Sequence, residues 1–185
     1  MDIQDFLQQN AGRWMSQRTT HHLLLNRSEA AKANLVIERL SPADAQVVQL
    51  CQLTGAEATQ ALGGLKTTWT DGISEQNPKP QSGTSLLLLL PQDSTNQGQI
   101  ITQLNQTPPV AGEYSLGEDE VLTLVTTTAE MRVEERLWFA SENFRLRTNV
   151  ISRQDKTHLA SFCSEIRMLS QPPTPSAQTA AEAAN

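Results

Sequence analysis

The feature that most constrains the fold is a series of short β-prone segments that occupies the chain after Leu53. These segments are rich in aliphatic, aromatic and Thr residues, and Gly or Pro residues lie in the gaps between them. The segments are Leu65 to Thr70, Ser85 to Leu90, Gln99 to Leu104, Glu113 to Leu116, Glu120 to Thr127, Met131 to Phe139, Phe144 to Ser152, and His158 to Met168. So many strands at short spacing favour an antiparallel meander, and closure into a barrel removes its exposed edges.

The N-terminal third adds two strands and two short helices to this prediction. Strands are expected from Trp14 to Leu25 and from Leu35 to Ile37, with a polar break at 26–34 between them. These bring the total to about ten. Helices are expected over 1–11, with Asp2 as the cap, and over about 42–53, where Ser41 would cap a helix that begins at Pro42. The fold class is therefore mainly β: a single antiparallel barrel with two short helices.

Composition limits the domain count and the function. The 185 residues fit one domain, predicted over 1–170, while 171–185 lack large apolar side chains and read as a disordered tail. A formal net charge of -6 argues against nucleic acid or an anionic membrane as partner. No apolar run has the roughly 20 residues of a membrane span, and the N-terminus does not resemble a secretory signal, so we expect a cytoplasmic protein.

Metal and thiol chemistry find little support in the sequence. Cys51 and Cys163 are far apart and lack CxxC spacing, so we expect two inert, buried thiols. The histidines His21, His22 and His158 are too few to form a convincing zinc site with these cysteines. We therefore predict no metal.

One carboxylate stands out in the strand from Met131 to Phe139. Alternation places Glu135 on the same face as Val133 and Leu137, so it is the one acid on an otherwise apolar stripe. A buried and unpaired carboxylate costs several kcal/mol, about 3 to 5 when its partner is removed. The site should therefore supply a cation, a hydrogen bond or a proton close to Glu135.

The returning strand offers two cations, and the length of the turn decides where they point. With a three-residue loop within 140–143, Glu135 would lie opposite Arg147 and diagonal to Arg145; with two residues, both arginines would move to the Trp138 face. Two interpretations remain open. The pair is either a solvated cross-strand ion pair worth under about 1 kcal/mol, or part of a pocket whose guanidinium groups bind the carboxylates of a large apolar ligand.

Motifs in the N-terminal half agree with a barrel that holds a ligand in its mouth. Gly12-Arg13-Trp14 after a short helix is the G-x-W pattern that opens lipocalin-like barrels. His21 is either a hydrogen-bonded barrel histidine or a site residue. Trp69 is either core or a flat wall for a conjugated ring system.

Four motifs carry a resemblance to a known family. The segments WMSQRTTHHL, TTWTDG, ERLWFASENFRLRTNVI and FCSEIRML occur in the order found in the S-type bilin lyases, the CpcS/CpeS family of phycobiliprotein lyases, and cover most of residues 1–170. The resemblance implies a ten-stranded lipocalin-like barrel. It also implies that the protein binds phycocyanobilin or a related open-chain tetrapyrrole and attaches it as a thioether to a cysteine of an apo-phycobiliprotein subunit.

The same resemblance assigns roles to individual residues. It implies chromophore binding by Arg18, Trp69, Arg145 and Arg147, and catalysis by Glu135 and His21. The bilin would be a transferred substrate, with no permanently bound cofactor. The expected partners are an apo-subunit of the phycocyanin, allophycocyanin or phycoerythrin type and, by analogy with relatives, a second copy in a homodimer. The alternatives are a non-catalytic carrier of a bilin or other carboxylated apolar ligand, and an adaptor that binds subunits without pigment.

Overall fold

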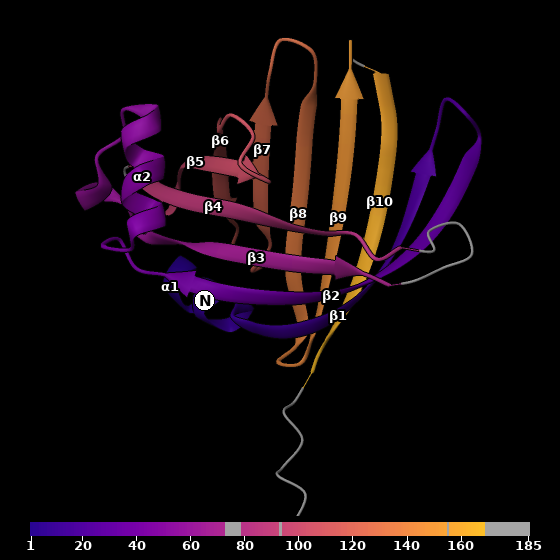
Figure 1. The fold of residues 1–185 in the computed structure, drawn as a ribbon, viewed down its shortest axis with the longest axis horizontal. Coiled ribbons are helices and arrows are strands. Elements are labelled where there is room, and N and C mark those ends of the chain that lie inside the picture. The colour runs from indigo at the N-terminus through magenta and orange to yellow at the C-terminus, as the bar shows by residue number, and fades with distance from the viewer. Residues whose placement is uncertain (73–78, 93, 155, 169–185) are drawn as a thin grey trace, which may run out of the picture.

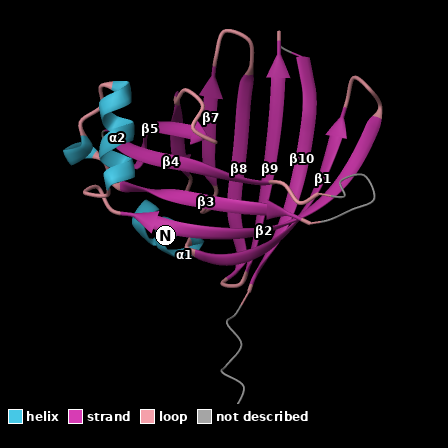
Figure 2. Ribbon diagram, in the orientation of Figure 1, coloured by secondary structure: helices cyan, strands magenta, loops and turns pink. Residues whose placement is uncertain are grey.

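The computed structural model describes residues 1–72, 79–92, 94–154 and 156–168, and these form a mainly β fold with short helices (Figure 2). The helices are α1 (Ile3–Asn10), α2 (Ala45–Thr54) and the 3₁₀ turn η1 (Ala58–Gln60). The strands are β1 (Gly12–His22), β2 (Arg27–Leu40), β3 (Gly63–Asp71), β4 (Ser82–Gln92), β5 (Ser94–Leu104), β6 (Val110–Leu116), β7 (Leu122–Thr127), β8 (Arg132–Ser141), β9 (Phe144–Arg153) and β10 (Lys156–Arg167). The predicted tail at 171–185 lies outside the described residues.

The ten strands form one closed antiparallel barrel, as the sequence predicts (Figure 1). Each strand pairs with its neighbours in the chain, and β1 closes the barrel by pairing with β10. The register places Trp14 opposite Arg167, and Arg18 opposite Cys163. Closure thereby brings the first strand beside the last one, and residues almost 150 positions apart share one wall.

Helix α1 belongs to the barrel core. The Asp2 side chain accepts a hydrogen bond from the Asp5 amide, which confirms the predicted cap. Ile3, Phe6 and Leu7 recur at helical spacing and are fully buried in the cluster that fills the interior. The helix therefore packs into one end of the barrel, beside the C-terminal end of β2 (Figure 1).

Helix α2 covers the outside of the sheet. Its predicted start at Pro42 is wrong: the helix begins at Ala45, because the Asp44 side chain accepts from the Gln46 amide at 2.8 Å and caps it. Val47 and Leu50 are buried against the outward Leu88 of β4, whereas Leu89 points into the interior cluster. The leucine run of β4 is therefore covered on both faces, as its lack of alternation predicts.

The polar break predicted at 26–34 is also wrong. β2 begins at Arg27 and pairs with the whole of β1, from Arg27 opposite His22 to Ile37 opposite Gly12. Its first residues are small or polar because most of them are exposed, so the segment lacks the apolar pattern of a half-buried strand. Neither α1 nor α2 is long and apolar enough to cross a membrane, and the described residues contain no cluster of acids, His and Cys that could hold a metal ion.

Candidate functional site

A cavity of about 490 Å³ runs through the barrel interior. This volume is within the range of small-molecule sites. Just over half of its lining residues are apolar, among them Leu65, Leu87 and Ile100. The charged groups that line it are Arg18, Lys32, Asp71, Glu135, Arg145 and Arg147. The structure therefore offers a large apolar ligand a binding space with a small set of charged contacts.

The β8–β9 hairpin places Arg145 and Arg147 on the same face as Glu135. It does so through a bulge that the sequence did not predict. Ser141 pairs with Phe144 across a two-residue turn, which without correction would send the arginines to the Trp138 face. A bulge between Phe139 and Ser141 shifts the register by one residue and returns the arginines to the interior. Neither of the two registers considered is found, because Glu135 lies opposite Asn149 and diagonal to Arg147.

A buried ion pair connects β9 with β10. Arg145 lies opposite Glu165, and its Nε donates to Glu165 Oε2 at 2.5 Å. Glu165 is completely buried and also accepts from Ser16 Oγ at 3.1 Å. Burial raises the pKa of Glu165, but Arg147 and Arg145 outweigh burial and hold that pKa below its usual range. Glu165 is therefore an ionised carboxylate at neutral pH.

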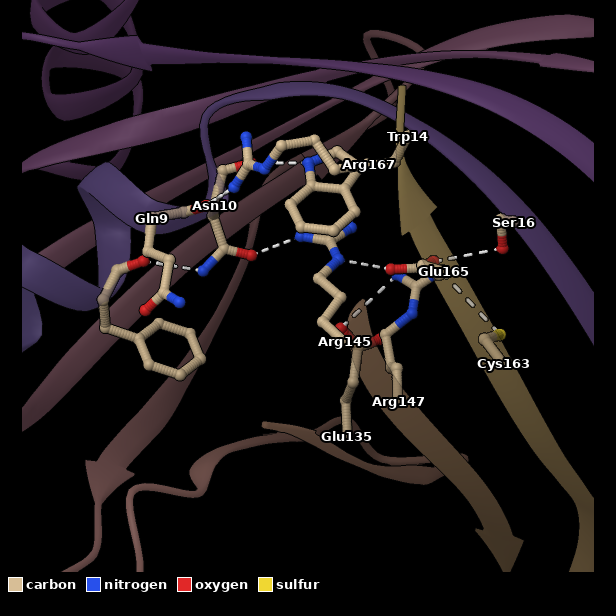
Figure 3. Close-up of polar contacts among 11 residues, drawn as sticks. Gln9, Asn10, Trp14, Ser16, Glu135, Arg145, Arg147, Cys163, Glu165 and Arg167 are labelled. Atoms are coloured by element: carbon tan, nitrogen blue, oxygen red, sulfur yellow. Dashed lines mark hydrogen bonds and ion pairs between the residues drawn. The ribbon is translucent and has the colours of Figure 1, made fainter. Parts of the chain in front are cut away.

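Arg145 also ties the barrel wall to α1 (Figure 3). Its Nη1 donates to the side-chain oxygen of Asn10, whose own amide donates to the Phe6 carbonyl at 2.8 Å. The Arg145 guanidinium stands 4.7 Å from the centre of the Trp14 ring, and the Trp14 indole donates to the Asn10 carbonyl at 2.9 Å. Only 3% of the Arg145 side chain is exposed, and its Nε and Nη1 are occupied by protein partners.

Arg147 and Glu135 are the more accessible pair. Arg147 Nη1 lies 3.7 Å from Glu135 Oε1, and 27% and 26% of the two side chains are exposed. Arg147 Nη2 also donates to Glu165 Oε1 at 3.1 Å. Burial lowers the pKa of Arg147, but the carboxylates of Glu135 and Glu165 raise it further than burial lowers it. A loose ion pair between two partly exposed groups can exchange partners when a charged ligand enters.

The other predicted binding residues also reach the cavity. Arg18 lines it from β1, one row beyond Ser16 and away from α1. Trp69 lines it from β3 and packs against the core cluster. Trp69 lies opposite Gly83, and a Cβ at Gly83 would collide with its ring, so the indole occupies space that only glycine leaves free.

The structure does not bring His21 into this group. Alternation along β1 turns Ser16, Arg18 and Thr20 toward the interior, and His21 toward the outer face. His21 is exposed and is not among the cavity-lining residues. Its neighbour His22 makes a contact of 3.2 Å with Glu29 across the hairpin.

The two cysteines are buried and neither forms a disulfide. Cys163 lies opposite both Arg147 and Arg18, so it is part of the charged wall. Burial is the main influence on its thiol and raises the pKa, which keeps the sulfur protonated and a poor nucleophile.

The sequence did not indicate Glu165, Asn10 or Ser16 as site residues. Glu165 falls within FCSEIRML and alternates with Cys163 and Ser161, so the signal was an acid on one face of a predicted strand. On that face of β10, however, Leu159 is the one large aliphatic residue, so the acid did not look misplaced. Asn10 and Ser16 gave no signal, because their roles depend on the packing of α1 and on closure between β1 and β10.

Comparison with known proteins gives a consistent result. The sequence model of the CpeS-like protein family matches residues 2–168. A chromophore lyase CpcS/CpeS from Thermosynechococcus vestitus is 42% identical over 170 residues, which cover 91% of this chain and 93% of the relative. A phycocyanobilin lyase subunit CpcS from Picosynechococcus is 33% identical over 180 residues, which cover 95% of this chain and 91% of the relative.

A solved structure supports the fold independently. The S-type phycobiliprotein lyase CPES from Guillardia theta aligns with a TM-score of 0.81 at 24% identity, over 92% of this chain and 95% of that one. The overall fold is therefore shared at low sequence identity.

Proposed function

This chain belongs to the CpeS-like family, and from that premise we propose that it is a bilin lyase. It binds phycocyanobilin or a related open-chain tetrapyrrole and attaches it as a thioether to a cysteine of an apo-phycobiliprotein subunit. The names of its relatives, chromophore lyase and phycocyanobilin lyase subunit, support this activity.

One observation carries the proposal: an apolar cavity of about 490 Å³ contains the accessible ion pair of Glu135 and Arg147. An open-chain tetrapyrrole is a large apolar ligand with two propionates and several pyrrole N–H groups. Arg147 and Arg18 are the accessible guanidinium groups in the lining, and they suit the propionates. Glu135 is an acceptor for pyrrole N–H groups. The indole of Trp69 provides a flat surface for a conjugated ring.

Arg145 has a different role in this proposal from the one first expected. The family resemblance implied that it binds the chromophore, but its Nε and Nη1 are occupied by Glu165 and Asn10. We assign Arg145 as a positioning residue that fixes α1 and orients Glu165. Glu165 in turn accepts a hydrogen bond from Arg147, so it sets the direction in which that guanidinium points.

The proposed reaction is an addition without a leaving group. The acceptor thiolate attacks the ethylidene carbon of the pigment, the C–S bond forms, and the π electrons pass into the conjugated pyrroles. A proton then adds to the pigment, so the thiol S–H has added across one C=C bond and no oxidant is consumed. The chain contributes mainly by holding pigment and thiol in position. Glu135 is placed to hold a proton at the pyrroles, while the predicted proton transfer by His21 would take place outside the cavity.

The bilin is a substrate and not a permanently bound cofactor, and no metal takes part. The protein works in the cytoplasm on a phycocyanin, allophycocyanin or phycoerythrin type subunit, and acts as a homodimer. Residues 1–170 form the functional domain.

The test separates a lyase from a passive carrier. Purified protein, phycocyanobilin and an apo-subunit are incubated, the mixture is denatured, and pigment that remains on the subunit is measured. A lyase increases the yield of attached pigment, or the fraction of pigment that is attached correctly, over the spontaneous reaction. A carrier binds pigment and leaves both unchanged, and that result would reject the proposal.

A further inference from the structure

The β1–β2 hairpin ends in three consecutive leucines that face solvent. Leu23, Leu24 and Leu25 are 50%, 64% and 72% exposed. Exposed apolar residues are common one at a time, but three in a row on a projecting tip form a patch typical of interaction sites.

The turn itself does not require leucine. Asn26 has a positive φ of 47° and supplies the left-handed residue that such turns need. The other preferred turn residues are Gly, Pro, Asp and Ser, and none of them occupies 23–25. Local conformation therefore explains Asn26 and leaves the three leucines unexplained.

The tip lies at the mouth of the cavity. The end near α1 is closed by buried groups, among them Phe6, Asn10 and Arg145. The lining becomes exposed toward the opposite end, at Arg18 and at Leu104, which is 51% exposed. β1 continues from Arg18 to His22, so the β1–β2 hairpin extends beyond Arg18 on this side of the barrel, away from α1 (Figure 1).

The tip is held in place by neighbouring strands. The Leu23 amide donates to the His158 carbonyl of β10 at 3.0 Å, and the Leu25 amide donates to the His22 carbonyl at 3.1 Å. His22 contacts Glu29 across the hairpin. An apolar surface that is already ordered loses less conformational entropy on binding than a flexible loop.

From these observations we propose that the leucine tip, Leu23 to Leu25, docks the acceptor protein through an apolar depression beside its acceptor cysteine. This inference rests on the proposed function, because the acceptor sulfur must come within bonding distance of a pigment that the cavity holds. The acceptor therefore has to cover the mouth. At the mouth, the leucine tip and Leu104 expose large apolar side chains. The tip thus selects and orients the acceptor, and the cavity selects the pigment.

The test measures association without chemistry. The combined variant Leu23→Ser, Leu24→Ser, Leu25→Ser is compared with the native chain for binding to the apo-subunit in the absence of pigment, by titration calorimetry. We expect the Kd to rise about tenfold or more, as for the loss of an apolar hot spot. Leu53→Ser is the matched control, since Leu53 is 62% exposed at the end of α2. Its Kd should not change.

Pigment binding provides the second readout. The triple variant should bind phycocyanobilin as the native chain does and, given enough acceptor, transfer it at the native rate. Equal acceptor Kd for variant and native chain, or no association of the native chain, would overturn the docking inference. If the native chain binds the apo-subunit through the tip but does not accelerate transfer, the lyase proposal fails while the docking inference stands.

Two other occupants of the tip would also overturn the inference. The first is a second copy of the chain. Sedimentation of the protein alone would show this if the native chain were a dimer and the triple variant a monomer. The second is a membrane surface. It would be indicated if the native chain cosedimented with phosphatidylglycerol vesicles and the triple variant did not. We expect neither property to differ between the two proteins.

Discussion

Arg145 Nε lies 2.5 Å from Glu165 Oε2, and both side chains are buried, at 3% and 0% exposure. The pair is central to the polar part of the barrel. Arg145 also donates a hydrogen bond to Asn10 of α1, and Glu165 also accepts hydrogen bonds from Arg147 and Ser16. The barrel thus contains a structural pair near α1 and an accessible pair, Glu135 and Arg147, next to it (Figure 3). We assign stability to the first pair and ligand binding to the second.

Removal of the Glu165 charge should destabilise the fold. Glu165→Gln leaves the buried Arg145 without its carboxylate, and breaking a buried pair in this way costs about 3 to 5 kcal/mol. Chemical denaturation measures the free energy of unfolding. The control is Glu134→Gln, since Glu134 forms a more exposed pair with Arg132 and its loss should cost less than about 1 kcal/mol. Equal losses in the two variants would contradict the structural role of Glu165.

The same carboxylate predicts a sensitivity to acid. Arg147 and Arg145 hold the pKa of Glu165 below the ordinary value of 4.5 despite its burial. Its contribution is therefore complete above the unfolded pKa and is lost as pH falls through the lower folded pKa. Unfolding free energy, measured downward from pH 5, should fall more steeply for the native chain than for Glu165→Gln. Parallel curves would show that Glu165 does not control acid stability.

Arg18→Gln should affect pigment and leave the fold intact. Arg18 is exposed at the mouth, so its replacement should change the unfolding free energy by about 0.5 kcal/mol or less. Loss of one charge-assisted contact to a propionate should weaken phycocyanobilin binding about 10- to 100-fold. Absorption titration gives the Kd. Arg13→Gln, on the outer face of the same strand, is the control and should bind normally.

Glu135→Gln should fold normally, bind pigment with an altered visible spectrum, and transfer it more slowly. A neutral amide still accepts a hydrogen bond but no longer favours a protonated tetrapyrrole. Glu134→Gln changes the adjacent residue on the opposite face of β8 and serves as the control. An unchanged spectrum and full transfer by Glu135→Gln would remove Glu135 from the site.

Gly83→Ala should displace the indole of Trp69. A Cβ at this position would overlap the Trp69 ring and also crowd Asn105 Oδ1. We expect shifted tryptophan fluorescence and weaker pigment binding. Gly72→Ala is the control, because among the described residues its Cβ would meet Lys32 alone, with the nearest atom at 3.4 Å. Native fluorescence and affinity in Gly83→Ala would show that the indole position is not set by this glycine.

Strand number and barrel closure could be predicted from the sequence because they follow from local signals. Turn residues separate the strands, and alternation identified Glu135 as an acid facing the interior. Alternation is misleading in β10, however, where Phe162 and Ile166 are exposed while Glu165 is buried. The interior of this wall is polar, so hydrophobicity there indicates the outer face.

The register of the site could not be read from turn length. The bulge at 139–141 restores the arginines to the Glu135 face, and no residue in that stretch is a Gly or Pro that would mark it. The roles of Asn10 and Ser16 depend on contacts across more than 130 residues of sequence. Such contacts exist only after the barrel has closed, so local patterns carry no trace of them.

The most direct test of the account is the rate of covalent attachment of phycocyanobilin to an apo-subunit, read by mass spectrometry after denaturation. The account predicts that the native chain and Glu134→Gln accelerate the gain of one pigment mass on the acceptor cysteine, and that Glu135→Gln does so much less. If the subunit gained pigment at the same rate with and without the native chain, this protein would not be a bilin lyase.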